Sequence, residues 1–343
     1  ALLSGAVLVP TSRDPRHRAL DVVGSVLSML GFSVLLYAII QAPERGWTDP
    51  GILAAFAIAV ALLSVFVVWE RRSVHPMLPI EEFSDRRFSA GAAGIALTFF
   101  AMFGLFFIST QYLQFVLGYS PLRAGLALLP MAVMMVLVAP RSAPWAERFG
   151  RNRVMATGLV VIASGMLVMS TLSPASRYPA VALALLLFGV GMGLTTAPAT
   201  GAIMEAMPLA KAGVGSAVND TTREVGGSLG VAVLGSLLAT GYRHHLAAHL
   251  TGVPPALAGV ARQSVGAALA VSRGIPAPLG RPLADAARHG FTDGMAVVFM
   301  AACAVALLTA ALELAAMPGR EERAAQLARL DESALGVKAQ EAR

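Results

Sequence analysis

The chain has 343 residues, of which 56% are hydrophobic and only 13% are charged. Soluble domains hold about 25% charged residues, so this composition excludes an ordinary soluble globular protein and indicates a polytopic membrane protein. The net charge is +6 and the isoelectric point is near 10.1. Because the arginines lie between apolar runs, they indicate membrane topology and not a nucleic-acid partner. With Cys303 as its one cysteine, the chain forms no intrachain disulfide.

The first ten residues, ALLSGAVLVP, are apolar but too short to cross a bilayer. No basic segment precedes them as in a signal peptide, so we interpret residues 1–10 as the end of a truncated transmembrane helix. Eight longer apolar runs follow, each near the roughly 20 residues that a span needs. We therefore predict an all-α, polytopic helix bundle. The predicted spans are about 20–40, 51–69, 88–117, 122–140, 154–172, 180–204, 213–240 and 291–317.

Most Lys and Arg residues lie in every second loop, namely TSRDPRHR, ERRSVHPMLPIEEFSDRR, AERFGRNR and MPLAKAG. Cytoplasmic loops of membrane proteins carry this excess of positive charge, so we predict that these loops face the cytoplasm. By parity the tail at 318–343 is cytoplasmic as well. The long segment at about 242–290 is then an external loop, and its Ala, Gly and Pro content favours loose order with short amphipathic helices.

Three stretches resemble one transporter family. TQYLQFVLGYSPLRAGLALLP resembles the junction that opens its C-terminal domain, FGVGMGLTTAPATGAIMEAMP resembles its twelfth helix, and GVGSAVNDTTREVGGSLGVAVLG resembles its thirteenth. The family is the major facilitator superfamily, in its fourteen-helix drug:proton antiporter branch of the QacA/EmrB type. The resemblance implies that the chain is a C-terminal fragment. Residues 11–87 would hold two linker helices with cytoplasmic loops and residues 88–317 a six-helix transporter domain, while the N-terminal six-helix half is missing.

The resemblance also implies the function, which is proton-coupled efflux of small amphipathic or cationic drugs or antibiotics across the bacterial inner membrane by alternating access. The partners are then a small-molecule substrate, protons and the lipid bilayer, and the energy source is the proton gradient, without a cofactor or metal. The alternatives are an exporter of one metabolite, siderophore or endogenous antibiotic, and a non-transporting scaffold, sensor or inactive truncated product. The sequence has no GxxxxGK[ST], GxSxG or HExxH motif, which argues against ATP-driven transport and against an enzyme.

The strongest candidate site is the charged first half of the span at 213–240. If this helix enters the bilayer near Gly213, a rise of 1.5 Å per residue places Arg223 and Glu224 about 15 Å deep, near the midplane. Charge at that depth is costly unless it faces a cavity or a partner. We predict a proton or cation relay made of Asn219, Asp220, Arg223 and Glu224; the structural alternative is an ion pair between Arg223 and one of the two acids.

The glycine-rich helices suggest packing or hinge positions. Small residues let membrane helices approach closely, and a proline within a helix frees a carbonyl and permits a bend. The functional interpretation is a rocking interface, and the alternative is plain close packing. The residues are Gly189, Gly191, Gly193, Pro198, Gly226, Gly227 and Gly230.

Two further groups have weaker signals. The loop AERFGRNR resembles a degenerate copy of the superfamily's cytoplasmic gating loop, and its candidates are Glu147, Arg148, Gly150, Arg151 and Arg153, with ordinary positive-inside charge as the alternative. Gln111, Tyr112 and Gln114 could hydrogen-bond a drug in the substrate cavity, or join helices as interhelical contacts. Among single acids, we expect Glu205 and Glu313 at the cytoplasmic surface, and Asp21 and Asp293 as helix caps.

Overall fold

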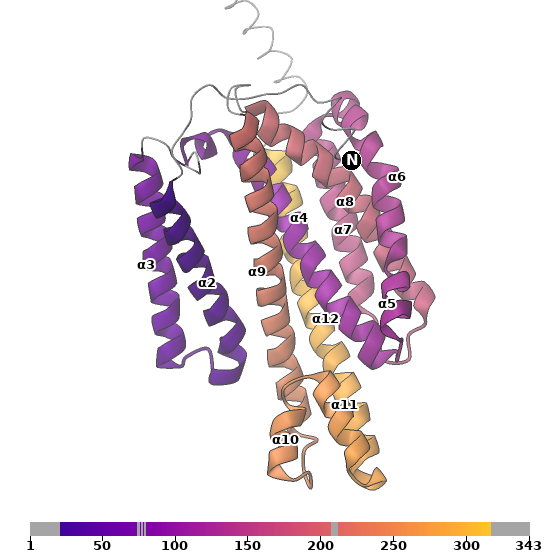
Figure 1. Ribbon diagram of the computed structural model, residues 1–343. Coiled ribbons are helices and arrows are strands. Elements are labelled where there is room, and N and C mark those ends of the chain that lie inside the picture. Colours follow the sequence, from indigo (N-terminus) through magenta and orange to yellow (C-terminus); the bar gives the residue numbers. More distant parts are fainter. Residues whose placement is uncertain (1–20, 74–75, 77, 79, 207–211, 317–343) are drawn as a thin grey trace, which may run out of the picture.

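The computed structural model describes residues 21–73, 76, 78, 80–206 and 212–316. The predicted helix end at 1–10 and the tail at 318–343 lie outside the described residues. Every regular element within the described residues is helical, which confirms the predicted all-α class (Figure 1). The elements are α2 (Val22–Arg45), α3 (Pro50–Arg72), the 3-10 helix η1 (Ile80–Ser84), α4 (Arg86–Gln111), the π-helix η2 (Tyr112–Val116), α5 (Pro121–Ala127), α6 (Leu129–Phe149), α7 (Arg151–Ser170), α8 (Tyr178–Ala206), α9 (Ala212–Ala247), α10 (Pro255–Ala261), α11 (Val265–Gly274) and α12 (Ala277–Ala316).

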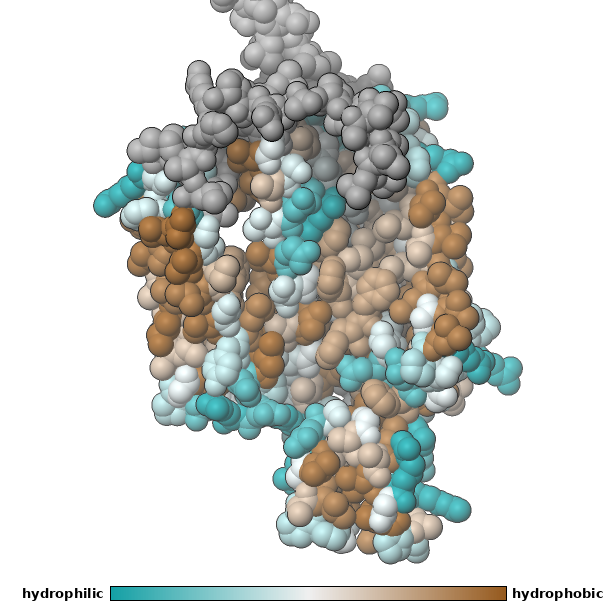
Figure 2. Space-filling model, viewed as in Figure 1, coloured by the Kyte–Doolittle hydropathy of each residue, from teal (hydrophilic) through white to brown (hydrophobic). Residues whose placement is uncertain are grey.

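Eight helical segments of the described chain are long and apolar enough to cross a membrane, and they confirm the eight predicted spans. Their outer faces carry large apolar side chains: Met29, Leu122 and Val136 are between 67% and 75% exposed. On the face seen in Figure 2, apolar surface forms a broad belt across the helices, with hydrophilic residues concentrated toward the two ends. A belt of this kind fits lipid and not water. The segments are Val22–Arg45, Pro50–Arg72, Phe88–Val116, Pro121–Phe149, Arg151–Ser170, Tyr178–Glu205, Gly213–Ala247 and Ala277–Ala315.

The helices α4 and α9 approach each other through glycine. Gly226 lies against the carbonyl of Ala96, and Gly230 lies against the carbonyl of Phe100. A Cβ at either glycine would lie less than 3.0 Å from that oxygen, which is closer than real Cβ atoms approach other atoms. Helix association in membranes depends on this kind of close packing, because lipid supplies no hydrophobic driving force between helices. Gly227 meets the ring of Phe103 on the same seam.

The glycines of α8 serve two different neighbours. Gly189 lies against the backbone of Met131 in α6, and a Cβ at Gly193 would lie 2.8 Å from Cβ of Val138 in the same helix. Gly191 points the other way, to the backbone of Gly158 in α7. Since these three glycines alternate along α8, the helix packs tightly between α6 and α7. Pro198 lies farther along α8, where it is buried.

The helices α2 and α3 form a pair that stands beside α9 (Figure 1). Asp21 caps α2 by accepting a hydrogen bond of 2.8 Å from the Gly24 amide, as expected, and its carboxylate also accepts one of 3.0 Å from Trp69 Nε1 of α3. The pair is joined to α9 where Ser236 Oγ donates to the Ile39 carbonyl at 2.7 Å. This buried side-chain contact with the backbone fixes α2 against α9.

The segment at 242–290 was expected to be a loosely ordered external loop with short amphipathic helices. Short helices are present, but the segment is more regular than expected. α9 continues to Ala247, α10 and α11 follow, and α12 begins at Ala277, well before the predicted start at 291. Figure 1 shows α10 and α11 projecting beyond the other helices at one end of the bundle. Their order comes from a small core of their own: Leu246 and Ala261 are fully buried, and the hydroxyl of Tyr242 lies 3.0 Å from the Ala261 carbonyl.

The longer α12 also changes the interpretation of Asp293, which was expected to cap a helix start. Asp293 lies well inside α12, and its carboxylate oxygen is 3.2 Å from Nδ1 of His245 in α9. The cap prediction is therefore wrong. The prediction failed because the polar sequence before residue 291 resembles a loop, although it is the first part of α12.

The α4–α9 seam generates a stability prediction. Gly230→Ala places a methyl group against the Phe100 carbonyl, and overpacking of this kind costs about 1–3 kcal/mol. We expect a lower thermal unfolding temperature for the purified full-length protein in detergent. Gly213→Ala is the matched control in the same helix, because a Cβ there meets nothing within 4 Å. Equal unfolding temperatures for the two variants would contradict the close approach.

Candidate functional site

The candidate site on α9 is a network of polar side chains that spans two helices. Thr200 of α8 donates a hydrogen bond of 3.1 Å to Asn219 Oδ1, and Arg223 Nη2 donates one of 3.2 Å to Thr200 Oγ1. Asn219 is 5% exposed, so its amide depends on these partners. Asn219 Nδ2 also lies 3.4 Å from Asp220 Oδ1. Thr200 therefore connects Asn219 and Arg223, which lie four positions apart on one face of α9.

The two acids of the cluster have different surroundings. Arg223 Nη1 lies 4.0 Å from Asp220 Oδ1, so Arg223 forms its ion pair with Asp220. The pair is weak because this distance is long. Glu224 is exposed and forms no ion pair within the described part of the chain. Of the two partners that the sequence left open for Arg223, the structure favours Asp220. Glu224 is left as an accessible acid beside a fixed positive charge.

The guanidinium of Arg223 is also held from the side of α4. Its central carbon lies 5.1 Å from the centroid of the Phe99 ring, a distance typical of a cation–π contact. Its Nε is buried and has no acceptor among the described residues. Arg223 therefore contacts α4, α8 and its own helix at once. A movement of any of these helices would change the position of this charge.

Residues 219–224 lie within the Gly213–Ala247 span, and Figure 2 shows a hydrophilic patch beside α9 inside the apolar belt. Charge in such a place requires water or a partner, because hydrocarbon solvates it poorly. An accessible carboxylate beside an arginine can bind a proton or a cationic ligand, and the arginine competes with either for the acid. Exchange of protons or cations is the chemistry that this arrangement permits.

The predicted gating loop becomes the corner between α6 and α7. Gly150 turns it with φ +95°, a conformation that side chains other than glycine rarely adopt. Arg151 Nη2 lies 2.7 Å from Glu205 Oε1 of α8, which places Glu205 in an ion pair where a solvated loop acid was expected. The Arg148 guanidinium lies over the Phe149 ring, while Glu147 and Arg153 are exposed.

The predicted cavity residues Gln111, Tyr112 and Gln114 are not brought together. Tyr112 is fully buried and its hydroxyl donates a hydrogen bond of 2.8 Å to the Ser173 carbonyl, so it joins helices. Gln111 Nε2 lies 3.4 Å from the Phe107 carbonyl of its own helix. Gln114 lines a cavity at the end of the bundle near α11.

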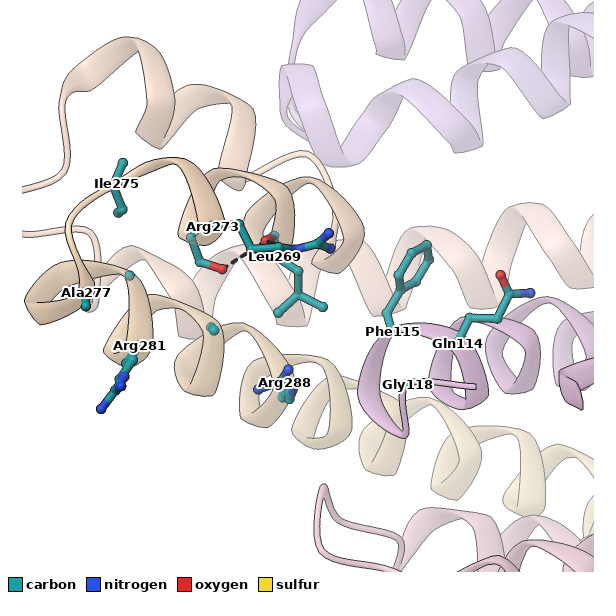
Figure 3. Close-up of a pocket in the computed structure, with 12 residues that line it drawn as sticks. Gln114, Phe115, Gly118, Leu269, Arg273, Ile275, Ala277, Arg281 and Arg288 are labelled. Atoms are coloured by element: carbon teal, nitrogen blue, oxygen red, sulfur yellow. Dashed lines mark hydrogen bonds between the residues drawn. The ribbon is translucent and has the colours of Figure 1, made fainter. Parts of the chain in front are cut away.

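This cavity has a volume of about 540 Å³ and lies between η2, α11 and the first turns of α12 (Figure 3). Gln114 and Phe115 form one side of it. Arg273 of α11 points toward Phe115, and Arg281 and Arg288 of α12 also line the cavity. Arg288 is 3.4 Å from Asp285, and Arg273 Nε donates to its own Leu269 carbonyl at 3.1 Å. The lining is basic and opens away from the α9 network.

Two residues of interest were missed from the sequence. Thr200 gave no signal, because a threonine in an apolar helix is ordinary and its partners are about twenty positions away. Glu313 was expected to reach the membrane surface, but it is 2% exposed and lies against Gly94 of α4. That prediction is wrong. The sequence did offer one signal: Glu313 lies a few residues inside the end of the predicted span at 291–317.

Histidines offer no further site. His245 and His249 stack with ring centroids 5.3 Å apart, and His245 pairs with Asp293. Within the described ranges, no three His, Cys, Asp or Glu side chains gather as metal binding would require.

Residues 17–231 match the sequence model of the Major Facilitator Superfamily. The chain belongs to this superfamily. It is 33% identical over 91% of its length to the multidrug efflux pump LfrA of Mycolicibacterium smegmatis, and 32% identical over 92% to a tetracenomycin C resistance and export protein of Streptomyces glaucescens. A puromycin resistance protein of Streptomyces alboniger is 34% identical over 75% of the chain. The chain spans 61%, 60% and 51% of the length of these three relatives, respectively.

The bridge through Thr200 can be tested by removing its hydroxyl. Thr200→Val leaves the buried Asn219 amide without this donor, which costs about 1–3 kcal/mol. We expect a lower unfolding temperature for the full-length protein, and recovery with Thr200→Ser, which keeps the hydroxyl. In a double-mutant cycle with Asn219→Ala, the two effects should be non-additive. Additive effects would show that Thr200 and Asn219 do not interact.

Proposed function

We propose that this member of the superfamily is part of a carrier that exports small amphipathic or cationic compounds, drugs and antibiotics among them, in exchange for protons. The observation that carries the proposal is the α9 network, in which accessible Asp220 and Glu224 flank Arg223 inside a membrane span. Several relatives have printed names that describe multidrug efflux or antibiotic resistance, which supports the substrate class. The proposed location of the carrier is the bacterial inner membrane.

In the proposed cycle, a proton from outside neutralises Glu224 or Asp220. The neutral acid no longer attracts a cationic substrate, which leaves, and Arg223 then keeps its contacts with Thr200 and Phe99. Loss of the proton to the cytoplasm restores the negative charge and resets the carrier. The two faces open in turn as the helices of this half rock against an opposing half.

We further propose that the chain is the C-terminal part of a fourteen-helix carrier. In this proposal α2 and α3 are the linker helices and α4 to α12 form the C-terminal half, with the end of α12 toward the cytoplasm. The coverage of about three fifths of the relatives' length supports it. The test is the DNA upstream of the Ala1 codon: six further spans in the same frame are expected, and a start codon directly before Ala1 would overturn the proposal.

A second candidate is a narrow exporter of one compound. Two relatives are named for single antibiotics, tetracenomycin C and puromycin, which favours it. The discriminating measurement is the range of unrelated toxic compounds to which the full-length gene confers resistance. A broad range supports multidrug efflux, and protection against one compound supports the narrow exporter.

The relay can be tested in cells that carry the full-length gene and have been loaded with a cationic dye. Arg223→Ala removes a guanidinium whose hydrogen bond to Thr200 is worth about 1.5–3 kcal/mol, and Glu224→Gln removes the acid proposed to take up the proton. We therefore expect initial rates of energised efflux to fall by about tenfold or more in each variant. The control is Glu81→Gln, an exposed acid in η1, which should leave the rate unchanged. Wild-type rates in both relay variants, at equal expression, would refute the relay.

A further inference from the structure

The most isolated ionisable group of the described bundle is Glu313 of α12. It is 2% exposed, and its Oε2 is buried with no hydrogen-bond partner among the described residues. A Cβ on Gly94 of α4 would lie 2.9 Å from Glu313 Oε1 and 2.9 Å from Cε of Met155 in α7. The carboxyl group therefore lies against Gly94, at a point where α4, α7 and α12 meet.

No described positive charge compensates Glu313. On α7 the nearest cation in sequence to Met155 is Arg153, which is exposed, and Arg151, one turn before Met155, pairs with Glu205 of α8. On α9, Arg223 is joined to Thr200 and Asp220. The remaining described ionisable groups on elements packed against α12 lie at the start of α4, on the α9 network, toward the α11 end of the bundle or on α12 itself. Beside α4, in η2 and on α11 they are Asp85, Arg86, Tyr112 and Arg273; on α9 they are Asp220, Glu224, Tyr242, Arg243, His244 and His245; on α12 they are Arg281, Asp285, Arg288, His289, Asp293 and Cys303.

A second buried polar atom lies near Glu313. Thr98 follows Gly94 by four residues on α4, so it is on the same face one turn farther along. Thr98 is 1% exposed and its Oγ1 has no partner in the described chain. Because α12 runs antiparallel to α4, Thr309, one turn before Glu313, lies at the same level; it is 3% exposed and donates to the Val305 carbonyl. The seam is thus polar over two turns.

The protonation state follows from this environment. An ionised carboxylate without a partner is expensive in an apolar interior, and such a group takes up a proton instead. Protonated, the acid is neutral and is tolerated in the apolar surroundings of Gly94. Ionised, it would require water or a partner, and either needs the seam between α4 and α12 to widen.

We propose that Glu313 is a second proton-binding site, protonated in this conformation, that loses its proton to water when α4 and α12 separate. α4 also carries the contacts of the α9 network, because Phe99 lies against Arg223 while Gly94 lies against Glu313. A movement of α4 relative to its neighbours therefore changes both sites. The contribution of Glu313 to transport rests on the proposed antiport, whereas its protonation does not.

The first test is spectroscopic and uses the purified full-length protein in detergent. The infrared carbonyl band of a buried, protonated carboxylic acid should be present in wild type near neutral pH and absent in Glu313→Gln. It should remain in Glu81→Gln, the exposed control. Since glutamine imitates the neutral acid in shape, Glu313→Gln should fold. Glu313→Asp keeps the titrating group and should keep a carbonyl band. Identical spectra for wild type and Glu313→Gln would overturn the proposal.

The second test concerns stability and transport. A group that holds a proton only in the folded state makes the folded protein less stable as pH rises. The unfolding temperature of Glu313→Gln should therefore fall less with rising pH than that of wild type.

In pH-driven efflux, Glu313→Gln should bind substrate like wild type and lose about tenfold in rate. Wild-type efflux in Glu313→Gln would overturn the coupling role. Absence of efflux in wild type would instead refute the proposed antiport, while the infrared band would still decide protonation. Loss of the infrared band on addition of Na⁺ at constant pH would assign the site to sodium and overturn the proposal.

Discussion

The contact of α9 with the backbone of α4 is the constraint on which the rest of the arrangement depends. Gly226 and Gly230 remove the side chains that would hold the two helices apart, so the carbonyls of Ala96 and Phe100 lie directly against α9. This approach brings Phe99 within 5.1 Å of Arg223 and sets the α9 network at a fixed depth. On its other side α4 presents Gly94 to Glu313. One helix thus contacts both buried charged features.

The same physical problem is solved differently at the two features. At Arg223 the charge is retained, because Thr200, Asp220 and an aromatic face share it. At Glu313 no such partner exists among the described residues, and neutralisation by a proton is the remaining solution. In the proposed carrier the two groups have complementary roles: Arg223 is a fixed charge that biases the acids beside it, and Glu313 is an acid whose proton depends on helix separation.

The sequence predicted the membrane class, the eight spans and the concentration of charge at 219–224, because hydropathy and helical periodicity are local properties. It could not predict Thr200, since its role depends on a contact between helices. Glu313 was misplaced for the same reason: depth in a span says nothing about which face meets α4. Short helices in the segment at 242–290 were predicted, but its order was underestimated, because small residues and prolines resemble a loop whereas Tyr242 and Leu246 give it a packed core.

The measurement that tests the central claim most directly uses the purified full-length protein in sealed vesicles with an imposed pH gradient and no ATP. The account predicts that a cationic dye accumulates against its own gradient while a trapped pH indicator reports protons moving the opposite way, and that a protonophore abolishes both movements together. Dye movement that persists at full rate without a pH gradient, or without any proton flux, would contradict it.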